Sequence, residues 1–205
     1  MKKFFDKIFG KAKEEDSVEK RLVSDDLPNS IVDETIIENE DEETRFVRLY
    51  NQTGGKFLYS SEETELLSYL NEIAKENDFN SFWCADPNLQ KYLTRLGVSY
   101  TTVPEPSSQI NFIDCEYLIS FNGSVMISSH QTDNRKLHEM SNTFIVIAYP
   151  DQIVENISDG LRKIKYLKQN NIPTNITTIK GLNHDSMQQT NSKSIYLLLT
   201  ERPKC

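Results

Sequence analysis

Apolar residues along this chain gather in short runs, and the clearest pattern is a pair of runs joined at Asn122-Gly123. An Asn-Gly pair between two apolar runs is a strong signal for a β-hairpin. A third run, at 143–149, is apolar at nearly every position, which is typical of a strand covered on both faces. The stretch 114–150 therefore predicts a hairpin and a buried strand. We expect the strands near positions 118 and 146 to lie side by side.

Strand and helix patterns alternate before this stretch, from about Thr44 onward. Ser60-Ser-Glu-Glu63 is a capping box, and Asp86-Pro87 and Gly97 are start and stop signals for a second helix. The predicted elements are a strand or helix at 46–50, a strand at 56–59, a helix from 63, a strand at 81–84, a helix up to 96, a strand at 98–103 and a loop at 104–109. Such an alternation predicts an α/β fold with an open, mostly parallel sheet that is covered by helices on both faces.

The chain after the hairpin continues the same pattern. A loop or short helix is predicted at 130–140, and a long helix from Asp151 to about Asn170. Its apolar residues recur with helical period at Ile153, Val154, Ile157, Leu161, Ile164 and Leu167. A strand at 176–179, a polar loop at 180–193 and a last buried strand at 194–199 complete the prediction.

The N-terminal part, 1–43, differs from the α/β domain predicted at 44–205. Residues 2–12 form a short basic amphipathic pattern, with Phe4, Phe5 and Ile8 on one face. This helix either docks on a membrane surface or a partner, or rests on its own domain. Residues 13–45 are rich in acidic side chains and have no sustained apolar period, so we interpret them as a flexible linker. An acidic docking tail is the alternative.

Composition narrows the class of protein. A net charge of −8 argues against nucleic-acid binding, which needs a basic face. No apolar run approaches the roughly 20 residues of a membrane-spanning helix, and the N-terminus lacks the pattern of a signal peptide, so we expect a cytoplasmic protein. The three cysteines, Cys84, Cys115 and Cys205, form no C-x-x-C pair. We therefore expect no zinc or iron–sulfur cofactor bound by this chain alone, and buried thiols at Cys84 and Cys115.

The segment Ile119-Ser-Phe-Asn-Gly-Ser124, followed in order by Arg135, Leu137, the strand at 143–149 and Gln152-Ile-Val154, resembles the LUD-domain family of LutC/YkgG-type lactate-utilization proteins. The resemblance spans roughly 44–200. It implies a NagB/RpiA/CoA-transferase-like fold, with the β-hairpin as an insertion. The family's glutamate-threonine before the glycine is Phe121-Asn122 in this chain. Of the family's C-terminal loops, which look like phosphate- or carboxylate-binding loops, only Gly181 is plainly kept.

Candidate ligand-binding residues lie where strands of an open α/β sheet are expected to end. They are Asn122, Gly123, Ser124, Arg135, Asn183, His184 and Asp185. The backbone at Asn122-Gly123 could approach an anion, although a plain hairpin explains the pair equally well. Arg135 could hold a small carboxylate or phosphate by its bidentate guanidinium. No catalytic residue stands out, and His130 and His138 are spaced too widely for a helical metal pair, so we expect them to face solvent.

Two functions of different class follow. By resemblance, the chain is an accessory subunit in lactate or organic-acid utilization, working with iron–sulfur oxidoreductase subunits that carry the electrons. The alternative is a non-catalytic ligand-sensing or assembly protein on the same scaffold, with a degenerate anion-binding site. The altered C-terminal loops and the acidic N-terminal part favour the alternative.

Overall fold

The computed structural model describes residues 40–76, 81–103, 109–182 and 192–202. The predicted helix at 2–12 and most of the acidic linker lie outside these residues. The helices of the described part are α3 (Glu42–Gln52), α4 (Glu63–Glu76), α5 (Pro87–Leu96), α6 (Ser129–Thr132) and α7 (Ile157–Leu167), with 3₁₀ turns η1 (Leu137–Glu139) and η2 (Pro150–Gln152). The strands are β1 (Lys56–Ser60), β2 (Ser81–Trp83), β3 (Tyr100–Thr101), β4 (Gln109–Asp114), β5 (Tyr117–Ile119), β6 (Ser124–Ile127), β7 (Thr143–Ala148), β8 (Ile153–Val154), β9 (Thr177–Gly181) and β10 (Ser192–Thr200).

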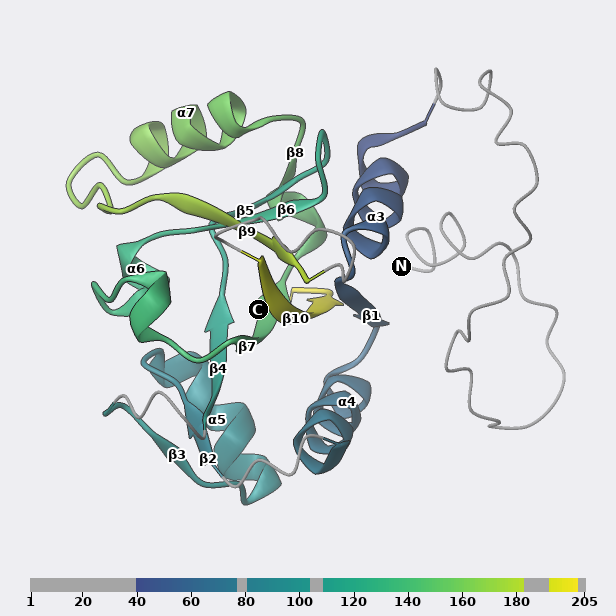
Figure 1. The fold of residues 1–205 in the computed structure, drawn as a ribbon, viewed down its shortest axis with the longest axis vertical. Helices are drawn as coiled ribbons and strands as arrows, with labels where there is room; N and C mark the ends of the chain where they lie inside the picture. The colour runs from purple at the N-terminus through teal and green to yellow at the C-terminus, as the bar shows by residue number, and fades with distance from the viewer. Residues whose placement is uncertain (1–39, 77–80, 104–108, 183–191, 203–205) are drawn as a thin grey trace, which may run out of the picture.

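These strands form one hydrogen-bonded path with two parts (Figure 1). The larger part has the order β3-β2-β4-β7-β10-β1, and all its strands are parallel. The smaller part has the order β8-β5-β6-β9 and contains the antiparallel β5–β6 hairpin. The two parts are joined where β9 pairs with the first residues of β10. The predicted α/β class, the mostly parallel sheet and the hairpin insertion are therefore confirmed.

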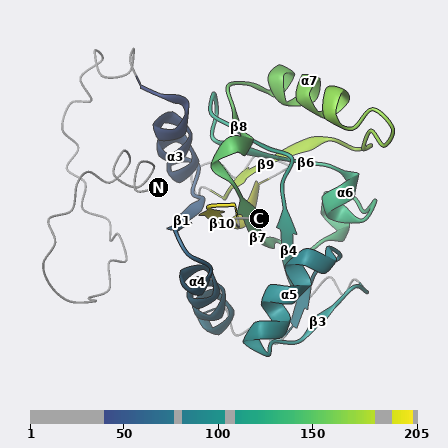
Figure 2. The same ribbon diagram turned by 180° about the vertical axis from the view of Figure 1, so that it is seen from behind.

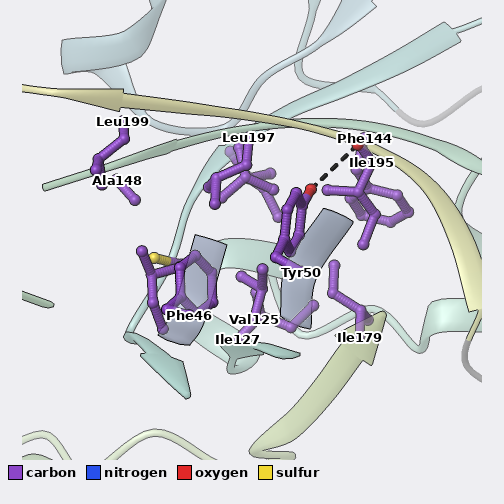
Figure 3. Packing of buried hydrophobic residues seen from close by; sticks show 14 of the residues in the cluster. Phe46, Tyr50, Val125, Ile127, Phe144, Ala148, Ile179, Ile195, Leu197 and Leu199 are labelled. Atoms are coloured by element: carbon purple, nitrogen blue, oxygen red, sulfur yellow. Dashed lines mark hydrogen bonds between the residues drawn. The ribbon is translucent and has the colours of Figure 1, made fainter. Parts of the chain in front are cut away.

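The all-apolar strands are buried on both faces because both faces of the larger part are covered. Different elements cover each face. Ile145 and Ile147 of β7 point to the side covered by α4 and α5. Phe144, Val146 and Ala148 point to the other side, which is covered by α3 and by the folded-back smaller part (Figure 3). The molecule is thus layered, and α7 packs on the outer face of the smaller part (Figures 1 and 2). A strand with this environment has no polar face, as the sequence pattern predicted.

Helix α3 fills the space between the two parts of the sheet. The sequence predicted either a strand or a helix at 46–50. The segment is a helix that begins at Glu42, with Asp41 as its N-cap. Phe46 and Tyr50 are fully buried and stack with ring centroids 5.5 Å apart. The hydroxyl of Tyr50 donates to the carbonyl oxygen of Ile195 at 3.1 Å, so that no polar atom of this ring is left unsatisfied in the core (Figure 3).

The prediction missed strand β4, which lies at the centre of the larger part. It assigned no element between the loop at 104–109 and the stretch from 114, because Asn111 and Asp114 interrupt a short apolar run. Asn111 is buried, yet its amide donates to the side chain and carbonyl of Ser141 and to the carbonyl of Thr143. A polar side chain satisfied in this way fits a buried strand.

Three further predictions need correction. The strands near 118 and 146 do not lie side by side, because β7 pairs with β4 and β10 while β5 pairs with β6 and β8. The helix predicted from Asp151 begins only at Ile157, after the N-cap Asn156. Before it, the chain forms η2 and the short strand β8, which completes the smaller part. The strand predicted at 98–103 is confined to β3.

Candidate functional site

A cleft of about 910 Å³ lies at the carboxyl ends of β4 and β7. Helix α7 forms one wall of this cleft, and the residues that follow β4, β7 and β10 form the opposite wall. Glu42, at the start of α3, also borders it. Open α/β sheets bind ligands outside the carboxyl ends of their strands, and the volume is typical of a small-molecule site. We refer to it as the carboxyl-edge cleft.

Asp114 is the last residue of β4 and borders the cleft with most of its carboxyl group buried. Burial, together with the negative charges of Asp86 and Glu116, raises the pKa of Asp114 from 3.8 to about 6. Gln131 of α6 donates a hydrogen bond that partly opposes this rise. The oxygen of the Gln131 amide accepts from the backbone N–H of Ser128 at 2.9 Å, which fixes its orientation. Asp114 can therefore exchange a proton near neutral pH.

Glu116 lies two residues further along and forms an ion pair with Lys168, the residue that caps the end of α7. The ammonium group of Lys168 contacts the two carboxylate oxygens at 2.7 and 2.6 Å. The hydroxyl of Ser128 donates to the same carboxylate at 2.7 Å, and His130 Nδ1 lies 4.0 Å away. The side chain of Glu116 is only 4% exposed, so Lys168 supplies the charge compensation that a buried carboxylate needs.

The wall opposite α7 is built by the turn that follows β7. The side chain of Gln152 accepts from the backbone N–H of Tyr149 at 2.8 Å and donates to the carbonyl of Cys115 at 2.6 Å. This pair of bonds ties the turn to the end of β4. Arg202 stacks over the ring of Tyr149 and forms an ion pair with Asp151. Burial raises the pKa of Tyr149, so its hydroxyl remains a neutral hydrogen-bond donor at physiological pH.

The charges in the cleft leave one cation of α7 without a carboxylate partner in the described part of the chain. Arg162 pairs with Asp159, Arg202 with Asp151, and Lys168 with Glu116. The ammonium group of Lys163 instead lies over the ring of Tyr117, 5.7 Å from its centroid. The arrangement can bind a small polar ligand through one cation, one protonatable carboxyl and neutral donors. Among the described residues, no three His, Cys, Asp or Glu side chains are grouped so that they could hold a metal ion.

The predicted residues Asn122, Gly123 and Ser124 lie away from this cleft. They form the turn of the β5–β6 hairpin, which packs against the C-terminal half of α3. A Cβ atom on Gly123 would lie 2.5 Å from the backbone of Leu49, so glycine is required there for close approach. Ser124 is buried, and its hydroxyl donates to the side-chain oxygen of Asn122 at 2.6 Å. Ligand binding by this turn stays a prediction.

Arg135 does not line the cleft and lies beside Trp83, the last residue of β2. Its guanidinium is 5.2 Å from the centre of that ring and donates to the carbonyl oxygen of Glu139. The described structure thus brings Arg135 together neither with the hairpin turn nor with the carboxyl-edge cleft. Asn183, His184 and Asp185 lie outside the described residues. The side chain of His138 is exposed, as predicted, whereas that of His130 is 31% exposed and faces Glu116.

The residues that build the cleft had only a weak signature in the sequence. Asp114 directly follows the apolar pair Phe112-Ile113, and a polar residue at the end of a parallel strand marks the usual site edge. The sequence prediction missed this signal because it assigned no strand at the position of β4. The pairing of Glu116 with Lys168 joins residues 52 positions apart, and no local pattern indicates it. Cys84 and Cys115 are buried and free, as expected, and burial raises the pKa of the Cys115 thiol.

The fold defines a class of protein: an α/β domain with a mostly parallel open sheet and an inserted antiparallel hairpin. It is similar to the crystal structure of a DUF162 family protein from Deinococcus radiodurans, with a TM-score of 0.59 and 15% sequence identity. The match covers 78% of this chain and 96% of that one. DUF162 is the LUD-domain family, so the fold implied by the resemblance is confirmed. No protein-family model and no curated protein matches the sequence. No helix in the described ranges is long and apolar enough to cross a membrane.

Proposed function

We propose that this chain is a LUD-domain protein that acts as an accessory subunit in the utilization of lactate or a related organic acid, and that it binds the acid in the carboxyl-edge cleft. The observation that carries the proposal is the position of Asp114 and Lys163 on one cleft at the carboxyl ends of parallel strands. The likeness in fold to a DUF162 protein supports the family part of the proposal.

The chemistry of the cleft suits a small 2-hydroxy acid. The ligand carboxylate pairs with Lys163, which has no carboxylate partner in the described part of the chain. The ligand hydroxyl bonds to Asp114, which accepts when it is ionised and donates when it is protonated. Because Asp114 titrates near pH 6, the affinity for an acid changes across that range. In the organic-acid pathways of the family that the chain resembles, separate iron–sulfur subunits carry the electrons.

Titration calorimetry with lactate, pyruvate and sugar phosphates tests the binding step. We expect lactate or pyruvate to bind. Lys163→Gln should weaken the affinity about tenfold, because the loss of one charge-assisted hydrogen bond costs about 1.4 kcal/mol. Lys165→Gln is the matched control, because this lysine lies on the same helix but does not line the cleft. Equal effects of the two substitutions, or no heat with any of these compounds, would contradict the proposed site.

The pathway is tested separately, by affinity purification from cells grown on lactate and by growth after deletion of the gene. We expect iron–sulfur oxidoreductase subunits to be recovered with the chain, and growth on lactate to slow. Recovery of none of these subunits, together with unchanged growth, would count against the pathway even if a ligand binds.

The second candidate is a non-catalytic ligand-sensing or assembly protein on the same scaffold. Its specific support is the exposure of two large apolar side chains beside the cleft, Tyr166 at 75% and Leu167 at 69%. Exposed apolar side chains that adjoin one another are typical of contact surfaces. Turnover of a 2-hydroxy acid or an acyl-CoA by the purified chain, lost on Asp114→Asn, would exclude this candidate.

A further inference from the structure

The carboxyl-edge cleft is much larger than a three-carbon acid. At roughly 30 Å³ per non-hydrogen atom, the value for liquid water, a three-carbon hydroxy acid fills at most about 200 Å³. The cleft measures about 910 Å³. Ligand sites in proteins usually enclose most of the surface of their ligand. A three-carbon acid would leave the greater part of this cleft empty, so the size of the cleft favours a longer ligand.

A second hollow adjoins the cleft at the end of α7. It measures about 530 Å³, and Tyr166, Leu167 and Lys168 line both spaces. Its other lining residues are His130 of α6 and three amide residues that follow α7, namely Gln169, Asn170 and Asn171. Within the described part of the chain, no acidic residue lines this hollow. We call it the amide hollow, because neutral amide groups dominate its polar lining.

The charge of Lys168, which lies between the two spaces, is already compensated. Its ammonium group contacts the two carboxylate oxygens of Glu116 at 2.7 and 2.6 Å. The same nitrogen lies 3.5 Å from Nδ1 of His130. Because an ammonium group only donates, Nδ1 accepts in this contact, which leaves Nε2 of a neutral His130 as a donor. The described lining of the amide hollow thus suits neutral hydroxyl groups better than a second carboxylate.

We propose that the ligand of this site is a polyhydroxy acid of about six carbons, an inference that rests on the proposed function. Its carboxylate pairs with Lys163, and its hydroxyl chain passes Tyr166 and ends at the amides of Asn170 and Asn171. An amide side chain both donates and accepts hydrogen bonds, as a hydroxyl group does. The carbon chain of the ligand covers part of the rings and methyl groups of Tyr166 and Leu167, which are 75% and 69% exposed without it.

The spacing along α7 fits a chain of this length. Lys163 and Lys168 lie about 7.5 Å apart along the helix axis, and the three amide residues follow directly. A six-carbon chain spans about 6 Å from its first carbon to its last, at about 1.5 Å per bond. Hydrogen bonds of about 2.8 Å at each end extend this reach to about 12 Å. A three-carbon acid is about 4 Å shorter and, when held at Lys163, ends short of the amides.

Titration calorimetry of the full chain with four acids tests the inference. D-gluconate has the carboxylate and the hydroxyl chain. Hexanoate has the same length without hydroxyl groups, adipate carries a second carboxylate at its far end, and lactate is the short reference. We expect D-gluconate to bind about tenfold more tightly than each of the other three, because it gains one or two hydrogen bonds to the amides. Hexanoate or lactate binding as tightly as D-gluconate, or adipate binding more tightly, would overturn the inference.

Substitutions separate this inference from the proposed function. Asn170→Ala combined with Asn171→Ala should weaken the binding of D-gluconate about tenfold and leave that of lactate unchanged. Lys163→Gln should weaken both acids by the same factor, because it removes the partner of the carboxylate that they share. Both asparagines are exposed, so the double variant should fold. Asn51→Ala is the matched control, because Asn51 is an exposed asparagine of α3 that lines neither space.

The two proposals fail in different ways. If Lys163→Gln weakens both acids but the double asparagine variant changes neither, the site binds an acid and the longer ligand is wrong. If none of the four acids binds, or if Lys163→Gln has no effect on any of them, the proposed function is wrong as well.

Discussion

Replacing Asp114 with asparagine is expected to change how the stability of the protein depends on pH. The substitution keeps the size of the side chain, and the asparagine oxygen can still accept the hydrogen bond from Gln131. It removes only the charge that Asp114 carries once it loses its proton. That charge is unfavourable in the folded state because the group is buried and lies near Asp86 and Glu116.

The sign and size of the effect follow from the two pKa values of this carboxyl. Its pKa is about 6 in the folded protein and 3.8 as an ordinary aspartate. Below pH 3.8 the group is neutral in both the folded and the unfolded chain, so it has no effect. Above about pH 6 it is charged in both, and the folded state carries the cost. Stability is therefore lost as pH rises through this window, by up to about 3 kcal/mol.

Urea unfolding followed by circular dichroism at a series of pH values measures the difference between the native chain and Asp114→Asn. The contributions of the other carboxyl groups largely cancel in this difference. We expect the two proteins to be about equally stable near pH 4 and the variant to be up to about 3 kcal/mol more stable near pH 7. A difference that stays constant with pH would refute the burial of an uncompensated carboxyl at the end of β4.

Two further substitutions probe the contacts that hold the site and the hairpin. Lys168→Met should lower the free energy of unfolding, measured by urea unfolding, by about 1–3 kcal/mol. This is less than for a fully buried pair, because the side chain of Lys168 is 34% exposed. Adding Glu116→Gln should recover part of the loss, because it removes the buried charge that Lys168 compensates. An unchanged midpoint would show that the pair is not formed. Gly123→Ala should cost about 3 kcal/mol or more in the same assay, because the new methyl group would meet the backbone of Leu49 and φ is +62°. Gly97→Ala is the matched control: it has a similar φ of +66° but open space, and should cost only about 1 kcal/mol. Equal losses at the two glycines would contradict the packing of the hairpin on α3.

Local signals in the sequence predicted most elements of the fold because they reflect local physics. The capping residue Asp86, the stop at Gly97 and the Asn122-Gly123 turn act within a few positions, and each lies where it was predicted. The errors arose where tertiary contacts override the local pattern. Ile153 and Val154 are in phase with the apolar residues of α7, yet they pair with β5 as a strand because the edge of the smaller part is open there.

The candidate site was harder to predict than the fold. Its chemistry depends on Asp114 being buried between Asp86 and Glu116, and on Lys168 returning from the end of α7 to compensate Glu116. These are contacts between segments far apart in the sequence. The sequence pointed to the hairpin turn because an Asn-Gly pair lets the backbone approach an anion. In the folded chain its polar groups bond to one another and its glycine permits close packing.

The claim that the carboxyl-edge cleft is the ligand site is tested most directly by NMR titration of the ¹⁵N-labelled full chain with lactate. We expect the amide signals of Cys115, Glu116 and Gln152 to shift in a saturable manner, while those of Gly123 and Arg135 stay in place. Saturable shifts confined to Gly123 and Arg135 would contradict this claim and would return the site to the residues first predicted from the sequence.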